Sequence, residues 1–218
     1  MSDKFTALTP ELYDYVVAHR SERDPVLEAL AAETAALGGI SLMQVAPDEG
    51  ALMTLLARAV GARSAVEIGT FTGYSALCIA RGLADDGRLL CCDINAEWTA
   101  IGRGYWDRAG VGHKIEVRIA PALETLRALP VTAQFDFAFI DADKTGYRDY
   151  YEEILPRLRP NGLVLFDNVL WMGTVVVEAS RDESTRALRA LNDFLADDPR
   201  VESVMLPISD GLTIVRKR

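Results

Sequence analysis

The stretch SAVEIGTFTGYSAL, residues 64–77, decides the fold, because a short apolar run leads into a glycine turn and then into a helical pattern. Gly69 and Gly73 permit a tight turn and let a ligand approach backbone N–H groups closely. Their G-x-x-x-G spacing differs from the dinucleotide and phosphate-loop fingerprints, and the acidic Glu67 just before it would repel phosphates. A cofactor with a ribose and a positive charge therefore suits this turn better than a nucleotide phosphate does.

The alternation of apolar runs with helical segments continues downstream of this stretch. We expect parallel strands over residues 64–68, 88–93, 114–119, 135–141 and 162–167, with helices between them. Residues 201–208 and 212–218 flank Ser209-Asp210-Gly211 and predict an antiparallel hairpin at the sheet edge. The sequence therefore predicts an α/β fold with a mixed seven-stranded sheet flanked by helices.

The first 60 residues carry three helical patterns, each introduced by a capping residue or a proline. The patterns cover residues 11–20, 26–37 and 49–60. No linker divides the chain, so we expect a single domain over residues 1–218, with N-terminal helices in 1–60 and an α/β core in 61–218. The helix VLEALAAETAAL is apolar enough that its own domain or a second copy of the chain must cover it.

Composition narrows the classes of protein to which this chain can belong. Its 218 residues are 50% hydrophobic, which is enough to bury a core without disulfides. The formal net charge of −9 disfavours non-specific binding to nucleic acid or anionic membranes. The start MSDKFTALTP lacks a signal-peptide apolar region, and no stretch approaches the ~20 apolar residues of a membrane span. We therefore expect a soluble cytoplasmic protein that binds neither nucleic acid nor membrane.

Metal chemistry, if present, must rely on oxygen ligands. The three cysteines, Cys78, Cys91 and Cys92, show no Cys-x-x-Cys spacing, and the chain has only two histidines, which excludes a structural zinc site. Cys91 and Cys92 are expected to be buried thiols on opposite faces of one strand.

Polar residues gather where the predicted strands end, which is where ligands bind in an open α/β sheet. Asp93 ends the second strand and can accept hydrogen bonds from both hydroxyls of a ribose, which indicates an adenosine-type ligand. Asp141, Asp167 and Asn168 end the fourth and fifth strands, so their oxygens can converge on one point. Such ligands select Mg²⁺, Mn²⁺ or Ca²⁺ rather than zinc.

At these residues the chain resembles the class I S-adenosylmethionine-dependent O-methyltransferases of the catechol and caffeoyl-CoA type. The resemblance extends from MQVAPDEGALMTLL through VEIGTFTGYSAL and IDADKTGYRDYYEEILPRLRPNGLVLFDNVLWMG to LPISDGLTIVRK. It implies a Rossmann-like fold, a homodimer and a cofactor site formed by Val45, Glu67, Gly69, Thr70, Ser75, Asp93 and Ala122. The chain departs from the family at Ala120-Pro121-Ala122, where Gly-x-Ala is common, which puts a methyl group in place of a hydrogen on the adenine side.

The resemblance also implies the chemistry. In this family a divalent ion, here Mg²⁺ first with Mn²⁺ or Ca²⁺ as alternatives, holds the vicinal diol of an aromatic ring beside the cofactor methyl group. Asp141 would contact both ion and acceptor, and Lys144 would accept the hydroxyl proton, with an ion pair to Asp143 as the alternative role. Trp171 would stack on the acceptor ring or else pack beneath its loop, while Trp98 and Trp106 are expected to be packing residues.

The predicted function is metal-dependent methyl transfer from S-adenosylmethionine to a hydroxyl of a catechol-like small molecule. One alternative is methylation of hydroxylated uridine in tRNA, which the net charge and the lack of a basic arm disfavour. A nucleotide-dependent oxidoreductase is disfavoured by the glycine spacing, and a binding module without chemistry by the presence of all the oxygen ligands and Lys144. Arg181 alone is a weak indication of a coenzyme A phosphate pocket, so small catechols are favoured as acceptors.

Overall fold

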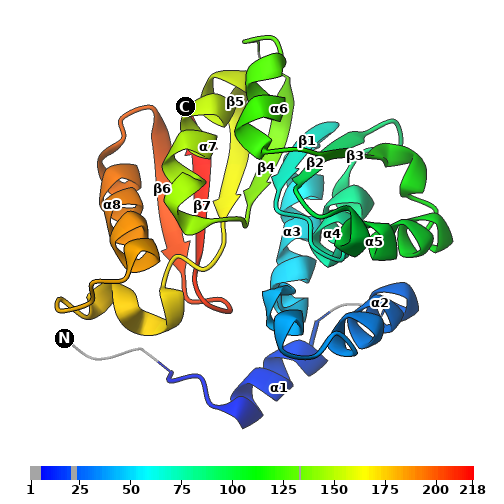
Figure 1. Cartoon of the computed structure of the whole chain (residues 1–218), viewed down its shortest axis with the longest axis horizontal. Helices are drawn as coiled ribbons and strands as arrows, with labels where there is room; N and C mark the ends of the chain where they lie inside the picture. The colour runs from blue at the N-terminus through cyan, green and yellow to red at the C-terminus, as the bar shows by residue number, and fades with distance from the viewer. Residues whose placement is uncertain (1–5, 21–23, 133) are drawn as a thin grey trace.

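Seven strands form one mixed sheet in the order β3-β2-β1-β4-β5-β7-β6 (Figure 1). The computed structural model describes residues 6–20, 24–132 and 134–218. The strands are β1 (Ser64–Ile68), β2 (Arg88–Asp93), β3 (Ile115–Ile119), β4 (Phe135–Ile140), β5 (Leu158–Phe166), β6 (Val201–Leu206) and β7 (Leu212–Lys217). The predicted Rossmann-like fold is confirmed, since β1 to β5 pair in parallel and β7 runs antiparallel between β5 and β6.

The strands β4 to β7 end one or two residues earlier than the sequence predicts, and β3 and β5 begin at other residues than predicted. Lys114 ends a short 3₁₀ helix before β3, and its ammonium donates hydrogen bonds to the carbonyl oxygens of Ala80 and Leu83. β5 begins at Leu158 rather than at residue 162, and its pairing with β4 shifts register between Phe135 and Phe137. The composition of Pro160-Asn161-Gly162 is typical of a loop. The register shift between β4 and β5 allows these residues to remain within the strand.

Helices cover both faces of the sheet (Figure 1). They are α1 (Pro10–Ala18), α2 (Pro25–Ala35), α3 (Pro47–Ala59), α4 (Tyr74–Gly82), α5 (Ala96–Arg108), α6 (Ala122–Ala128), α7 (Tyr147–Arg157) and α8 (Glu183–Asp197), with short 3₁₀ helices η1 (Gly38–Met43), η2 (Gly112–Lys114), η3 (Lys144–Gly146) and η4 (Trp171–Val176). Thr9 and Asp24 cap α1 and α2 as expected. Their side chains accept hydrogen bonds from backbone N–H groups in the first turns of these helices.

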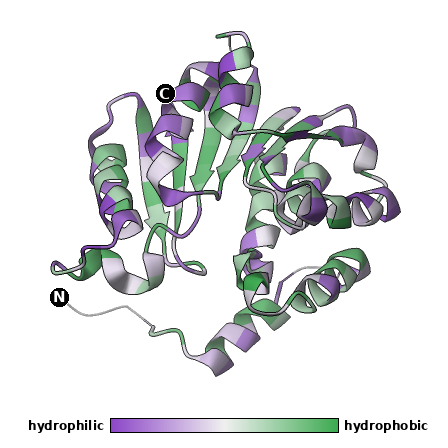
Figure 2. Cartoon of the chain, in the orientation of Figure 1, coloured by the Kyte–Doolittle hydropathy of each residue, from purple (hydrophilic) through white to green (hydrophobic). Residues whose placement is uncertain are grey.

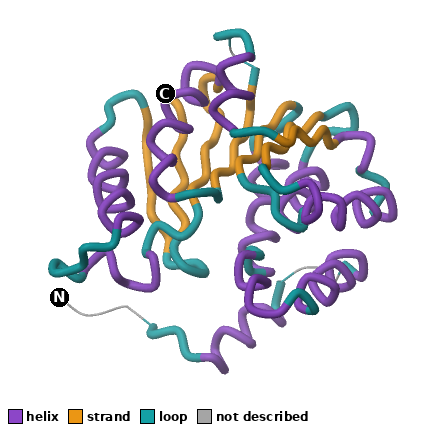
Figure 3. The backbone as a smooth tube through the Cα atoms, viewed as in Figure 1, coloured by secondary structure: helices purple, strands orange, loops and turns teal. Residues whose placement is uncertain are grey.

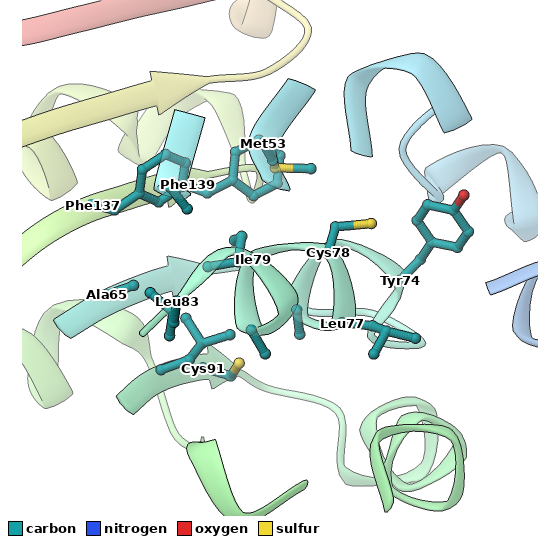
Figure 4. Close-up of a cluster of buried hydrophobic side chains, with 14 of the residues drawn as sticks. Met53, Ala65, Tyr74, Leu77, Cys78, Ile79, Leu83, Cys91, Phe137 and Phe139 are labelled. Carbon is teal, nitrogen blue, oxygen red and sulfur yellow. The ribbon is translucent and has the colours of Figure 1, made fainter. Parts of the chain in front are cut away.

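The core consists of one apolar cluster on each face of the sheet. Figure 4 shows part of the first cluster, in which Met53 lies near Phe137 and Phe139, and Cys91 lies below Ile79. The strands are mostly hydrophobic and the helices mixed, as expected for a sheet buried on both faces (Figure 2). Cys91 belongs to the first cluster and Cys92 to the second, so the prediction that these thiols face opposite sides is confirmed.

The N-terminal helices differ in how far the domain buries them. α2 packs on the first cluster through Leu30, and the hydroxyl of Thr34 hydrogen-bonds that of Thr72 in the glycine turn at 2.8 Å. Part of the apolar surface of α2 is thus covered by its own domain. α1 has no buried residue, and its Tyr15 is 60% exposed. Among the described residues, no helix has the length and apolarity needed to cross a membrane.

Candidate active site

A cavity of about 870 Å³ opens at the carboxyl ends of the parallel strands. Loops, teal in Figure 3, connect these strand ends to the helices and supply most of its walls. Residues at the ends of β1 and β2, in η1, η3 and η4, and near the starts of α4, α5, α6 and α7 complete the wall. The cavity lies where the strand order reverses between β1 and β4, which is the position that the sheet topology predicts for a ligand.

The glycine turn after β1 forms one wall of this cavity. Gly69 and Gly73 have φ of 87° and 85°, in the left-handed region that favours glycine. A Cβ atom on Gly69 would collide with the carbonyl oxygen of Asp141, and one on Gly73 would collide with the indole of Trp106. Trp106 also donates a hydrogen bond from Nε1 to the carbonyl oxygen of Gly73, so it packs against the turn. The glycines therefore allow the turn to lie against the end of β4.

Asp93 connects the glycine turn to the end of β2. Its Oδ2 accepts hydrogen bonds from the backbone N–H groups of Thr70 at 2.9 Å and Phe71 at 2.8 Å. Its Oδ1 accepts one from the N–H of Asn95 at 2.8 Å. A carboxylate has about four acceptor positions, so ribose hydroxyls can still bind this side chain from the cavity. The structure thus gives Asp93 a second role, fixing the turn, that sequence spacing did not reveal.

The other residues predicted to bind the cofactor fall into two groups. Five of them line the cavity: Val45, Gly69, Thr70, Ser75 and Ala122. Glu67 lies behind the wall and is fully buried, and among the described residues its carboxylate oxygens have no hydrogen-bond partner. Burial raises its pKa to about 7, although the hydroxyls of Ser75 and Thr70 oppose the shift. Glu67 therefore does not itself form part of the cavity wall.

The ends of β4 and β5 bring oxygen atoms together around one ammonium group. Lys144, which is largely buried, donates hydrogen bonds from Nζ to Asp141 Oδ1 at 2.9 Å and to Asn168 Oδ1 at 2.7 Å. It also contacts the hydroxyl of Tyr147, which in turn donates to the backbone carbonyl of Asp167. Lys144 thus pairs with Asp141 rather than with Asp143, the partner considered from the sequence.

Buried carboxyl groups cluster beside this ammonium. Burial and the neighbouring Asp141 raise the pKa of Asp167 to about 7. Glu49 of α3 is fully buried close by, and burial together with the charges of Asp167 and Asp141 raises its pKa to about 10. Nothing in the local sequence pointed to Glu49, because its proximity to Asp167 depends on how α3 packs against the sheet.

The arrangement fits a divalent cation. The oxygens of Asp141 and Asn168 are already close enough to bind one positive group, Lys144 Nζ. Burial and the charge of Asp141 raise the pKa of Asp167, so a cation bound here would stabilise the ionised form of this carboxyl group. Among the described residues, no three His, Cys, Asp or Glu side chains form a cluster that could hold a metal, so a site here depends on the amide oxygen of Asn168 as a donor.

Trp171 lines the cavity close to Asn168, whose backbone carbonyl accepts a hydrogen bond from the Trp171 N–H. Its ring centroid lies 5.6 Å from Lys144 Nζ, and its Nε1 donates a hydrogen bond to Asp182 at 3.3 Å. It lines the cavity and also packs against the second core cluster, so both roles considered from the sequence are compatible with its position.

Several wall residues were not selected from the sequence. Asp143 and Tyr150 line the cavity and are joined by a 2.5 Å hydrogen bond from the Tyr150 hydroxyl. Trp98, expected to be a packing residue, packs edge-on against Phe71 with ring centroids 5.2 Å apart, and both rings line the cavity. The helix η3 and the start of α7 separate Asp143 from Tyr150, while α4 and β2 separate Phe71 from Trp98, so the contacts depend on how these elements fold.

Comparison with known proteins shows the family to which the chain belongs. A family model described as O-methyltransferase matches residues 17–218. Caffeoyl-CoA O-methyltransferase 2 of Zea mays is 40% identical, over 95% of this chain and 83% of its own length. An O-methyltransferase from Bacillus cereus in complex with SAH has a TM-score of 0.85 at 31% identity, covering 94% of this chain and 96% of its own. TomG from Streptomyces achromogenes, an O-methyltransferase in complex with SAM, has a TM-score of 0.85 at 30% identity, covering 95% and 96%. The chain belongs to the S-adenosylmethionine-dependent O-methyltransferases.

Proposed function

We propose that this O-methyltransferase depends on a divalent cation and methylates one hydroxyl of a catechol-like small molecule. The observation that carries the proposal is the convergence of Asp141 and Asn168 oxygens on one positive group, beside the buried Asp167. Asp141, Asp167 and Asn168 would hold the ion, with Mg²⁺ preferred over Mn²⁺ or Ca²⁺. When bound, the ion would supply positive charge that lowers the pKa of the acceptor hydroxyl.

The cofactor would occupy the wall formed by the glycine turn. Asp93 would accept hydrogen bonds from the ribose hydroxyls, while Val45, Ser75 and Ala122 line the same part of the cavity. Gly69 lies directly against Asp141, so the wall for the cofactor and the group that holds the acceptor are adjacent. This adjacency supports direct transfer, in which the acceptor oxygen forms a bond to the methyl carbon as the sulfur–carbon bond breaks.

Lys144 would accept or relay the proton that the acceptor hydroxyl loses. The Nζ atom of Lys144 contacts Asp141, and Asp141 would also contact the acceptor. The acceptor hydroxyl would therefore lie close to the Lys144 amine without a further movement. Trp171 would pack against the flat ring, since its indole lines the cavity beside Lys144. The alternative of tRNA methylation finds no support in the relatives described above.

The decisive experiment measures transfer of a labelled methyl group from S-adenosylmethionine. Catechols, flavonoids, caffeoyl-CoA and bulk tRNA serve as acceptors, each with Mg²⁺ and with excess EDTA. We expect transfer to catechols that requires the divalent ion. Full activity in EDTA would refute the role of the ion, and transfer to tRNA without transfer to catechols would refute the proposed acceptor class.

A further inference from the structure

We propose that Arg189 of α8 is a positioning residue for the methyl acceptor, because it holds the segment that carries Trp171 on the cavity wall. The acceptor segment, residues 169–177, follows the end of β5 and includes η4. The inference rests on the proposed function, in which Trp171 packs against the acceptor ring.

Arg189 binds the end of the acceptor segment through its guanidinium group. The Nε atom donates a hydrogen bond to the carbonyl oxygen of Val175 at 2.6 Å. The Nη2 atom donates to the carbonyl oxygens of Thr174, at 3.0 Å, and Val177. Each hydrogen bond found for this side chain among the described residues therefore ends on the backbone of the acceptor segment.

The chemistry of a helix end explains why an arginine fits here. The last carbonyl oxygens of a helix lack partners within it and carry partial negative charge, so a cation with several N–H donors stabilises them. Thr174 and Val175 lie in the last turn of η4, which ends at Val176. A planar guanidinium group can donate to several carbonyls at once in fixed directions, whereas the ammonium group of a lysine acts as a single point charge.

The contacts continue from the end of the segment to Trp171 itself. The hydroxyl of Thr174 donates a hydrogen bond to the carbonyl oxygen of Trp171 at 2.8 Å and lies 2.9 Å from the hydroxyl of Thr185 on α8. The indole Nε1 donates to Asp182, which is the N-cap residue of α8. α8 thus fixes Trp171 both through the backbone of its segment and through its ring.

These contacts come from one face of α8. Asn192 belongs to the same face, and its Nδ2 donates a hydrogen bond to the carbonyl oxygen of Val169 at 3.0 Å. The face therefore binds the acceptor segment from its first residue to its last. Its members follow one another at the three- and four-residue spacing of a helix: Asp182, Thr185, Arg189 and Asn192.

The backbone of the acceptor segment needs such contacts. Trp171 and Met172 have left-handed φ of 48° and 51°, a conformation that costs free energy for residues other than glycine and persists when surrounding contacts fix it. Met172 is 87% exposed, so packing of its side chain does not hold the segment. Hydrogen bonds do: Asp210 accepts one from Met172 N at 2.6 Å, and Arg189 donates three more.

The position of Trp171 affects the acceptor rather than the cofactor. Its ring centroid lies 5.6 Å from Lys144 Nζ, so a displaced indole changes where an acceptor ring lies relative to that amine. The wall assigned to the cofactor is formed by other elements, namely the glycine turn, the end of β2 with Asp93, and the start of α6 with Ala122. Loss of the Arg189 contacts should therefore impair acceptor binding and leave cofactor binding intact.

The test compares wild type, Arg189→Met and Arg189→Lys in steady-state kinetics with a catechol and in calorimetric titration with S-adenosylmethionine. Methionine is a long side chain without N–H donors. We expect Arg189→Met to raise the acceptor KM about tenfold, to change kcat by less than about threefold and to leave the cofactor Kd within about twofold. Arg189→Lys should give an intermediate KM, because it keeps the charge but loses the planar set of donors.

Arg103→Met is the matched control, because it makes the same change at an exposed position of α5 outside the cavity lining. It should leave all three constants unchanged. An acceptor KM that Arg189→Met does not raise would overturn the proposal. Equal losses of acceptor and cofactor affinity would also overturn it, since they would give Arg189 a role in general stability only.

Fluorine NMR of protein labelled with fluorotryptophan provides a measurement that needs no turnover. The chain has three tryptophans, Trp98, Trp106 and Trp171, and Trp171→Phe assigns the signal of interest. Arg189→Met should shift or broaden the Trp171 signal and leave the other two signals as in wild type; an unchanged Trp171 signal would refute the positioning role. If no catechol is methylated, the proposed function fails, and the Trp171 signal still decides whether Arg189 positions the indole.

Discussion

Replacement of Asp93 by alanine should weaken both the fold and the binding of the cofactor. The carboxylate accepts three backbone hydrogen bonds of 2.8–2.9 Å, from Thr70, Phe71 and Asn95. Thr70 and Phe71 are both buried, so their N–H groups lose an acceptor that water cannot easily replace. The glycine turn would then lack its connection to the end of β2.

Hydrogen bonds to a charged group contribute about 1.5–3 kcal/mol each, and bonds that share one carboxylate are not additive. We therefore expect Asp93→Ala to lower the free energy of unfolding by about 3 kcal/mol, which corresponds to a fall in Tm of roughly 6–12 °C for a domain of this size. Loss of a charged acceptor for the ribose should weaken S-adenosylmethionine binding by about 10- to 100-fold.

Denaturant unfolding measures the first effect, and calorimetric titration with S-adenosylmethionine at a temperature where the variant is folded measures the second. Asp86→Ala is the control, since its partner Arg63 is 66% exposed and the pair should contribute less than about 1 kcal/mol. Wild-type stability in Asp93→Ala would refute the role of this carboxylate in fixing the turn. Reduced stability with unchanged cofactor affinity would refute its contact with the ribose.

Four further outcomes are expected. Asp167→Ala should abolish turnover but leave S-adenosylmethionine affinity within a few-fold, as measured by calorimetry; a parallel loss of both would contradict its assignment to the ion. Lys144→Ala should regain turnover as the pH rises, because hydroxide can take the proton, whereas a defect of equal size at every pH would make this lysine a positioning group. Without a divalent ion, the raised pKa of Asp167 means that the folded protein binds more protons than the unfolded chain between about pH 4 and 7. Asp167 therefore lowers the free energy of unfolding as the pH rises through that window. Asp167→Asn should gain stability relative to wild type from low to neutral pH, as measured by denaturant unfolding. A difference in unfolding free energy that stays constant with pH would contradict this. Finally, we expect a homodimer that uses the exposed apolar side chains of α1, so light scattering should give twice the mass of one chain and Tyr15→Asp should shift it toward monomer; a monomeric wild type would contradict this.

Strand positions and the residues at their ends could be predicted from the sequence, because both depend on local patterns. A run such as FDFAFI is buried on both faces and must be followed by a loop at the carboxyl edge, so the location of Asp141 follows from its place in the chain. The same reasoning located Gly69, Asp93 and Asn168 on the cavity wall. The roles of Lys144 and Trp171 came from resemblance to a family rather than from pattern.

Tertiary structure decided which of these groups meet, and which other residues join them. Glu49 lies beside Asp167 because α3 packs across the end of the sheet, and Asp210 reaches Met172 because β7 inserts between β5 and β6. Neither contact has a local signature, since 118 residues separate the first pair and 38 the second. Periodicity reports whether a side chain faces the core or the solvent, whereas the distance between two side chains from separate elements depends on how those elements pack, and only the folded chain fixes that.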